Sequence, residues 1–295
     1  MTKKKIAITT DSNSGILPSE GLAHDVFVLP MPCLINGNLY FENVNLSQRV
    51  FYETLSSNTD VSTSQPSLGE LSEFWENVLK DYETIVHIPM SSGLSQSYSA
   101  SKSLAEHYGG RVHVVDNKRI SVTLKESVDD AVYLKERGAT PQEIKTYLER
   151  TATDASIYIA VDTMKYLKKG GRITPAAATI GQILKVRPVL QIHGEKLDKY
   201  ALVRNEEKAK EIMKSAIAKD LSERFGEYLL NGEMELCVAH TNNATKAATF
   251  AEELRKAFPT IPLRYCDPLP LSVSCHVGPY ALAVTCARVL NPTRA

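Results

Sequence analysis

The sequence predicts an α/β protein built as two domains, each a β-sheet layered with helices. Short apolar runs rich in β-branched residues alternate with longer helical patterns, which is typical of parallel sheets joined by crossover helices. A chain of 295 residues is long enough for one large core or two smaller ones, and we favour two. We expect strands at residues 6–10, 26–29, 85–88, 112–115, 157–161, 235–239 and 262–265.

Helix starts are clearly marked in the first half of the chain. Ser67 is followed three residues later by Glu70, and Thr140 by Glu143. Both segments fit a capping box, in which the hydroxyl and the carboxylate bond to free N–H groups of the first turn. A third helix is expected to open in the serine-rich segment after the strand at 85–88 and to run to about residue 107.

The second half of the chain shows different signals. Residues 186–192 and 196–203 have the pattern of a hairpin joined by 193–195, and the helix before it is expected to stop at the glycine pair 170–171, where positive φ is accessible. A last apolar helix is expected over residues 281–290. We place the domain change near residue 160, which gives domains of residues 1–160 and 161–295.

Composition and missing motifs exclude several classes of protein. The 34 basic and 34 acidic residues balance, so no net field attracts nucleic acid or anionic lipid. No apolar run reaches the length of a signal peptide core or a membrane span. Five cysteines without a C-x-x-C pair indicate reduced thiols in a cytoplasmic protein. Phosphate-loop, dinucleotide-binding and zinc motifs are missing, so we expect neither a metal nor a nucleotide cofactor.

Two hydroxyl-rich segments, residues 63–67 and 91–95, stand beside predicted helix starts. The second follows the carboxyl end of a strand, where open α/β sheets bind ligands, and free N–H groups at a helix start favour an anion. The alternative is that the hydroxyls only form caps and turns, which we accept for Ser67 and leave open for Thr63 and Ser64. We expect the two segments to meet in one site for the head group of an anionic ligand.

Four further positions carry weaker signals. Asp11 and Ser12, at the end of the first strand, are candidates for supporting the site, although capping or turn formation is the more frequent role of such a pair. His276 is expected at the start of the last helix, and a lone histidine is usually structural. A nucleophilic Ser95 would need a complete elbow motif, but a serine stands where the second glycine belongs.

Taken together, these segments resemble the DegV family. The matching pieces are residues 9–12, 63–67, 91–95, 115–117 and 167–173, then Arg204 before a lysine-bearing helix, and residues 276–279. They run in the family's order and spacing over nearly the whole chain.

The resemblance implies a two-domain fold with the ligand between the domains and no catalytic residue. One long-chain fatty acid, such as palmitate, stearate or oleate, would lie in a buried tunnel. A separate fatty-acid kinase would receive its carboxylate and make acyl phosphate for bacterial phospholipid synthesis, and transient membrane contact would suit such a carrier. The residues that the resemblance assigns to the carboxylate are Thr63, Ser64, Ser95 with Ser92 as the alternative, Arg204 and His276, and it assigns docking of the kinase to Arg172.

Two departures from the family pattern and three alternatives remain. Gln96 and Tyr280 stand where the family commonly has glycine. The alternatives are a serine-dependent acyl-ester hydrolase, a small-molecule phosphotransferase, and a lipid-sensing regulatory protein whose contact would be Arg172 with Lys168 and Lys169. The missing elbow glycine and phosphate loop favour the carrier.

Overall fold

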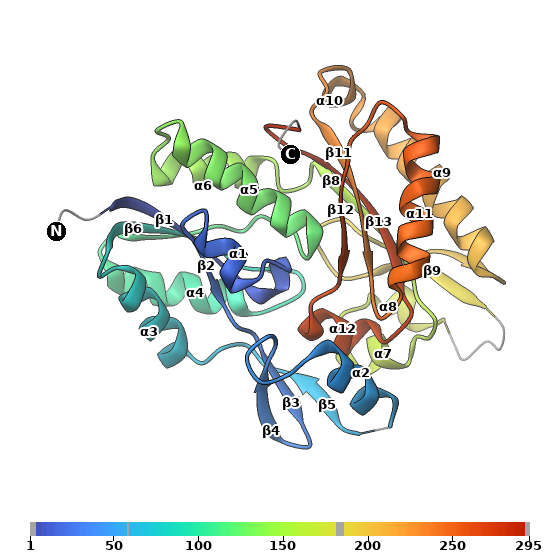
Figure 1. The fold of residues 1–295 in the computed structure, drawn as a ribbon, viewed down its shortest axis with the longest axis horizontal. Coiled ribbons are helices and arrows are strands. Elements are labelled where there is room, and N and C mark those ends of the chain that lie inside the picture. Colours follow the sequence, from blue (N-terminus) through green and yellow to red (C-terminus); the bar gives the residue numbers. More distant parts are fainter. Residues whose placement is uncertain (1–3, 58, 181–185, 293–295) are drawn as a thin grey trace.

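The computed structural model describes residues 4–57, 59–180 and 186–292, which form a four-stranded, a six-stranded and a three-stranded sheet with helices against them (Figure 1). The two larger sheets lie at opposite sides of the molecule, and the small sheet lies below them in this view. The predicted α/β class, with helices layered on sheets, is confirmed.

The first sheet is parallel throughout, with strand order β2-β1-β6-β7. Its elements are β1 (Lys4–Asp11), β2 (Val26–Leu29), β6 (Tyr82–Ile88) and β7 (Val112–Val114), with η1 (Ser12–Ser14), α1 (Pro18–Leu22), α3 (Leu68–Val78), α4 (Ser97–Ala105), η2 (Glu106–Tyr108), α5 (Val122–Glu136) and α6 (Pro141–Arg150). Successive side chains of β1 point to opposite faces, so Ala7 packs with Trp75 of α3 while Ile8 packs with residues of α5 and α6. Helices therefore cover both faces, as a parallel sheet requires.

The two predicted capping boxes are confirmed at the first residues of α3 and α6. Ser67 Oγ accepts a hydrogen bond of 3.1 Å from the Glu70 N–H, and the Glu70 carboxylate accepts one of 2.8 Å from the Ser67 N–H. Thr140 and Glu143 form the same pair, at 3.3 and 2.8 Å. The helix expected after the serine-rich segment is also confirmed, because α4 begins at Ser97.

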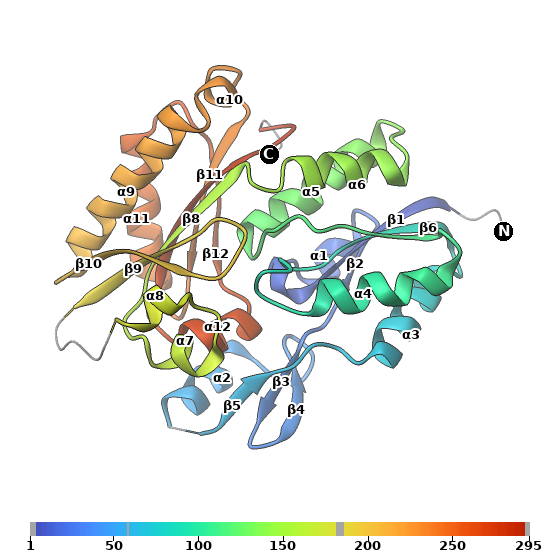
Figure 2. The ribbon, with the colours of Figure 1, turned by 180° about the vertical axis from the view of Figure 1, so that it is seen from behind.

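The second sheet is mixed, with strand order β10-β9-β8-β13-β11-β12 (Figure 2). Its elements are β8 (Ala155–Ala160), β9 (Arg187–Ile192), β10 (Asp198–Val203), β11 (Met234–His240), β12 (Leu263–Pro268) and β13 (Leu282–Arg288), with α9 (Glu206–Glu223), α10 (Gly226–Leu230) and α11 (Ala244–Ala257). The predicted hairpin is confirmed as β9 and β10. The expectation of parallel pairing was wrong for most of this sheet, where β11 and β12 pair in parallel and the other neighbours pair antiparallel.

The helix predicted over residues 281–290 was wrong, because this segment forms β13 in the interior of the second sheet. Both faces of β13 are buried: Ala283 packs toward the first sheet, and Val284 packs toward α9 and α11. A strand buried on both faces has a nearly continuous apolar sequence, and such a run has the same appearance as a buried helix.

The inner face of the second sheet shares one core with the first sheet. Ile159 of β8 and Ala239 of β11 belong to the same apolar cluster as Ile8 of β1 and Val128 of α5. The chain passes from the first sheet to the second between α6 and β8, so β8 precedes the predicted change at residue 160 yet pairs in the second sheet. The division of the chain into domains at that residue stays a prediction.

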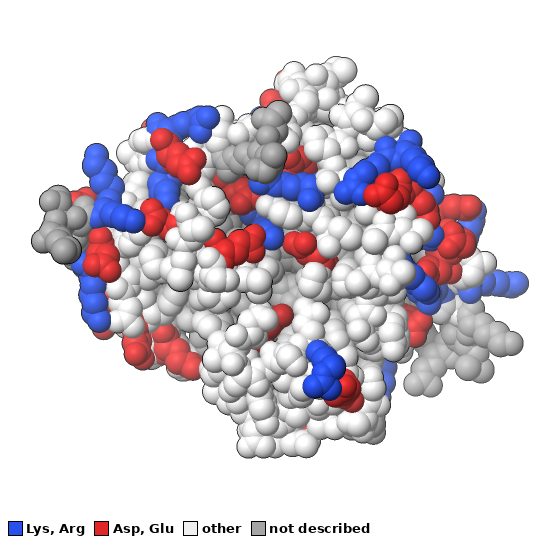
Figure 3. Space-filling view, in the orientation of Figure 1, with Lys and Arg blue, Asp and Glu red and all other residues white. Residues whose placement is uncertain are grey.

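The three-stranded sheet forms a small lobe that the sequence did not predict. Its strands are β3 (Pro32–Ile35), β4 (Asn38–Phe41) and β5 (Val61–Thr63), and beside them lie α2 (Gln48–Ser56), α7 (Lys165–Gly170) and α12 (Leu271–Val277). The short helix α8 (Pro175–Ala178) contacts β10 of the second sheet. Buried residues of the sheet, such as Cys33, pack on Phe51 of α2 and Leu271 of α12. In Figure 3 the visible face of the lobe is mostly uncharged, apart from one basic side chain beside an acidic one.

Candidate ligand-binding site

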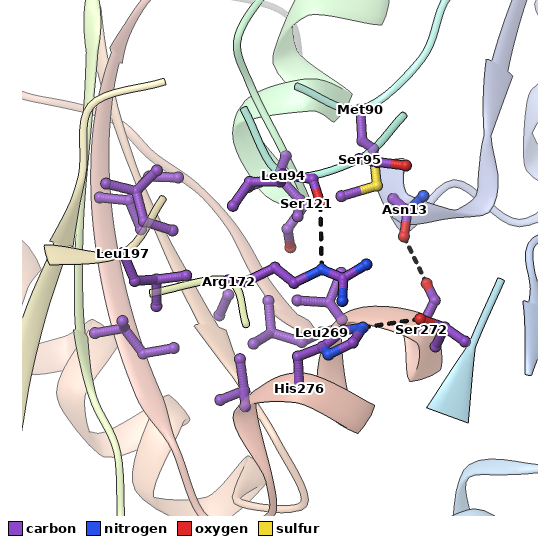
Figure 4. A pocket seen from close by; sticks show the side chains of 18 of the residues that line it. Asn13, Met90, Leu94, Ser95, Ser121, Arg172, Leu197, Leu269, Ser272 and His276 are labelled. Carbon is purple, nitrogen blue, oxygen red and sulfur yellow. Dashed lines mark hydrogen bonds between the residues drawn. The ribbon is translucent and has the colours of Figure 1, made fainter. Parts of the chain in front are cut away.

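One cavity of about 300 Å³ lies where the first sheet's loops, the small lobe and the inner face of the second sheet meet (Figure 4). This volume is at the lower end of the range for small-molecule pockets, which are typically apolar with a few placed polar groups. Its apolar wall includes Met31, Met90, Leu94, Ile120, Val122, Ile157, Ile159, Leu167, Ile192, Leu197, Ala239, Leu269, Val273, Val277 and Ala283. Its polar groups are Asn13, Thr63, Ser64, Gln65, Ser95, Gln96, Ser121, Arg172, Ser272, His276 and Thr285.

The two predicted hydroxyl segments do reach the same cavity. Thr63 is the last residue of β5, where it lies opposite Cys33 of β3, and Ser64 follows it at an exposed position. Ser95 precedes α4 by two residues, and its hydroxyl lies 2.8 Å from that of Ser97. The site thus has one contribution from the small lobe and one from the carboxyl side of the first sheet.

His276 joins the polar end from α12. It lies near the end of that helix, and its predicted place at a helix start was wrong because the following segment is a strand. Its Nε2 is 2.8 Å from Thr63 Oγ1, a hydrogen bond that links two positions far apart in the chain. Burial, with a smaller effect from Arg172, lowers the pKa of His276 to about 4, so the ring is neutral near pH 7.

The position of His276 requires a glycine on the neighbouring helix. A Cβ at Gly170, the last residue of α7, would lie 2.2 Å from His276 Nδ1. The ring therefore packs directly against the main chain of α7.

Arg172 lies inside this site, at a position that the sequence assigned to partner docking. Its Nε donates a hydrogen bond of 3.4 Å to the carbonyl of Leu94, and its Nη1 donates to the carbonyl of Gly170. Figure 4 shows the guanidinium between Ser95 on one side and His276 on the other. Among the described residues that line the cavity, Arg172 alone carries a full charge at neutral pH.

Two sequence candidates are not brought to the cavity. Ser92 points to another cluster, in which its hydroxyl donates to Asp116 at 2.7 Å and accepts a bond of 2.7 Å from Lys118. Arg204 is exposed at the bend between β10 and α9, outside the described lining. Of the two serines weighed for the head group, the structure places Ser95 in the cavity wall.

Sequence reasoning missed Asn13 and Ser272, which also line the polar end. Ser272 Oγ donates a hydrogen bond of 2.5 Å to Asn13 Oδ1, and Asn13 Nδ2 donates one of 2.8 Å to Asp11. Asp11 also accepts a bond of 3.0 Å from the N–H of Met90, and burial raises the pKa of this carboxyl to about 6. The polar run directly after β1 is the signal that could have located Asn13, and Asp11 stands behind the site as a support.

The serine hydrolase geometry is not present among the described residues. The hydroxyl of Ser95 is bonded to Ser97, while His276 is bonded to Thr63. His240 Nδ1 accepts a hydrogen bond of 3.2 Å from the N–H of Asn243. No serine and histidine here form the nucleophile–base pair that acyl-ester hydrolysis requires.

The described residues contain no group of three or more His, Cys, Asp or Glu that could hold a metal ion. None of the helices in residues 4–57, 59–180 and 186–292 has both the length and the apolar character needed to cross a membrane.

Fold and site together define a class: an α/β protein with a buried apolar cavity whose polar end carries hydroxyls and one guanidinium. A model of the DegV family, described as a family of uncharacterised proteins, matches residues 5–289. The chain therefore belongs to the DegV family.

Individual relatives extend this comparison. The solved structure of DegV, a fatty acid binding protein from Bacillus subtilis, is 26% identical with a TM-score of 0.83, and the match covers 97% of this chain and 100% of that one. A fatty acid binding DegV family protein from Streptococcus agalactiae is 25% identical with a TM-score of 0.84, covering 97% and 99%. A DegV domain-containing protein of Deinococcus radiodurans is 33% identical over 205 residues, 69% of this chain and 73% of that protein.

Proposed function

We propose that this protein binds one long-chain fatty acid, with the acyl tail in the cavity and the carboxylate at its polar end. The observation that carries the proposal is the division of the cavity into an apolar wall and a polar end with a single cation. The solved relatives from Bacillus subtilis and Streptococcus agalactiae, which are described as fatty acid binding proteins, support it.

The tail supplies most of the affinity in this proposal. Each methylene that leaves water for an apolar wall contributes about 0.8 kcal/mol. The wall formed by Ile157, Ile159 and Ile192 offers such an environment on the inner face of the second sheet. The polar end then fixes the register of the chain in the cavity.

The carboxylate is held by Thr63, Ser64, Ser95, His276 and Arg172. The hydroxyls donate to it, and the neutral His276 ring donates once its hydrogen bond with Thr63 rearranges. A guanidinium has five N–H donors, and two atoms of Arg172 already bond to main-chain carbonyls, so donors remain for the ligand. Bonds between a cation and a carboxylate are about twice as strong as neutral ones, which makes Arg172 the strongest single contact.

We further propose that the protein is a carrier that presents this carboxylate to a fatty-acid kinase and has no catalytic residue of its own. Ser64 and Gln65 line the cavity and are also exposed, so the carboxylate end is the end that faces solvent. Tyr280, half exposed in the turn between α12 and β13, replaces the family's usual glycine. Docking of the kinase through Arg172 stays a prediction, and in this structure the same side chain is available to the ligand.

Native mass spectrometry tests the proposal. We expect protein expressed in a bacterial host to show the added mass of one bound ligand. After organic extraction, this ligand should be identified as a long-chain fatty acid. Delipidated protein should take up oleate at one equivalent. Delipidated protein that takes up no fatty acid, or that turns over acyl esters, would contradict it.

A further inference from the structure

A second polar feature lies deeper in the cavity, away from the proposed carboxylate site. Thr285 of β13 lines the cavity, and pairing across the sheet places it between Ile157 of β8 and Cys237 of β11. The next row toward α12 on the same face is Ala283 with Ile159. Strands rise about 3.3 Å per residue, so Thr285 lies roughly 10 Å beyond the first residue of β13, which follows α12.

The hydroxyl of Thr285 is buried without a partner. The residue is 1% exposed, and its Oγ1 forms no hydrogen bond within the described residues. A buried polar group without a partner is unfavourable, because it loses its bonds to water. The neighbouring lining is aliphatic, and a valine would fill the same volume without that loss.

The surroundings of Thr285 restrict what its partner can be. Cys237 Sγ donates to Glu126 Oε1 at 3.2 Å, and Glu126 Oε2 is likewise buried without a partner. Glu235, 1% exposed, lies two residues before Cys237 on the same strand face. Burial and the nearby Glu235 raise the pKa of Glu126 to about 8, so this carboxyl is protonated near neutral pH. A second carboxylate in the ligand is disfavoured here, because its charge would lose its hydration beside buried acidic side chains, whereas a neutral group is accepted.

We propose that Thr285 forms a subsite for a neutral hydroxyl group on the distal part of the acyl chain, so that the protein accepts hydroxylated long-chain fatty acids. The inference rests on the fatty-acid-binding function proposed above. The ligand hydroxyl and Thr285 Oγ1 each supply the partner that the other lacks. A plain chain binds as well, but it leaves Thr285 unpaired.

The test compares oleate with ricinoleate, which has the same chain and double bond plus one hydroxyl. Binding of each is measured on delipidated full-length protein by displacement of a fluorescent fatty acid. The variants are Thr285→Val, which removes the hydroxyl at constant shape, and Ile159→Val, which changes the apolar wall one row away. We expect Thr285→Val to weaken ricinoleate relative to oleate about tenfold, and Ile159→Val to change both alike.

A second measurement uses the wild-type protein alone. In a series of stearates with the hydroxyl moved along the chain, affinity should peak where the hydroxyl reaches Thr285. A flat series, or an equal ratio of ricinoleate to oleate in wild type and Thr285→Val, overturns the subsite while fatty-acid binding stands. Failure of the wild-type protein to bind either acid overturns both proposals.

Discussion

At the scale of single residues, the polar end of the cavity depends on side chains that lack other strong partners. Thr63 bonds to a neutral histidine and Ser95 to another serine, so both hydroxyls can turn to a ligand at little loss. Ser67, four residues after Thr63, is occupied by Glu70 in the capping box. Neighbouring hydroxyls thus have separate roles, one in binding and one in helix stability.

This separation predicts different effects of similar substitutions. Thr63→Val and Ser95→Ala should each weaken fatty-acid binding about tenfold, because each loses a hydrogen bond to the charged carboxylate. The free energy of unfolding should stay nearly unchanged. Ser67→Ala should lower the free energy of unfolding by about 1 kcal/mol with unchanged affinity, because it removes a helix cap. Titration with a fluorescent fatty acid and urea denaturation measure the two effects. Affinities equal to that of the wild-type protein in all three variants would show that the hydroxyls do not bind the carboxylate.

His276 makes stability depend on pH with a definite sign. Its folded pKa of about 4 is below the ordinary value of 6.5, so between these values the unfolded chain binds more protons than the folded one. The stability that the neutral His276 ring contributes is fully present above pH 6.5 and is lost as the pH falls toward 4. His276→Gln, which does not titrate, should therefore lose less stability than wild type between pH 7 and 4. The two proteins should differ by on the order of 2 kcal/mol in this loss. This is less than the free energy that corresponds to the full pKa shift, because the ring is partly exposed.

Urea denaturation at several pH values measures this difference. Other buried groups, such as Asp11 and Glu42, also titrate in this range, and they contribute equally to both proteins. Parallel stability curves for wild type and variant would show that His276 titrates as an ordinary histidine.

At the scale of elements, the site depends on close approach between α7 and α12. The main chain of Gly170 leaves no room for a Cβ beside His276, so any side chain there must push the ring away from Thr63. Gly171, one residue later, differs: a Cβ there would meet open space, but its φ of +68° is strained for other residues.

The glycine pair offers a matched test of this packing. Gly170→Ala should weaken fatty-acid binding several-fold by displacing His276, while Gly171→Ala should lower stability by about 1 kcal/mol with unchanged affinity. Chemical-shift changes of the His276 ring in NMR spectra would report its displacement. An undisturbed ring and normal affinity in Gly170→Ala would show that α7 can move away from α12 without weakening fatty-acid binding.

At the scale of the whole molecule, a contact beside the cavity joins the two large sheets. Ser91 Oγ donates a hydrogen bond of 2.6 Å to the carbonyl of Gly194 in the loop of the β9–β10 hairpin. Lys118, after β7, forms an ion pair of 3.0 Å with Glu195 in the same loop. The serines of the hydroxyl-rich segment 91–95 therefore have different roles, because Ser95 lines the cavity while Ser91 bonds to the hairpin that helps to enclose it.

Gly93 allows this contact to close. A Cβ there would lie 2.7 Å from Glu195 Cα and 2.8 Å from the carbonyl of Gly194, so Gly93→Ala must push the hairpin away. We expect fatty acid to leave the variant roughly tenfold faster and the protein to become less stable, by about 1–3 kcal/mol. Gly69→Ala in α3 is the control, because the nearest atom to its Cβ would be Ser67 Oγ at 3.9 Å and the change should stabilise the helix slightly. Stopped-flow release of a fluorescent fatty acid measures the rate. Equal rates in wild type and Gly93→Ala would show that the hairpin does not hold the ligand.

The sequence by itself determined the features that depend on a few neighbouring residues. The capping boxes at Ser67 and Thr140 involve groups three residues apart, so their pattern is visible in the chain. The hairpin of β9 and β10 joins adjacent segments. The strands of the first sheet are marked by short β-branched runs, although their pairing joins segments far apart in the chain. The hydroxyl segments were located because they stand beside predicted helix starts, and the second also follows the carboxyl end of a strand.

Only the tertiary structure decided the features that depend on contacts between distant segments. Residues 281–290 form a strand because β8 and β11 offer it backbone partners on both sides, and the apolar sequence alone fits a helix equally well. Arg172 lines the cavity because α7 packs on α12, and Ser92 leaves it because Asp116 and Lys118 bind its hydroxyl. Hydrogen bonding within a turn is encoded locally, whereas the partner of a buried side chain is chosen by the packing of the whole chain.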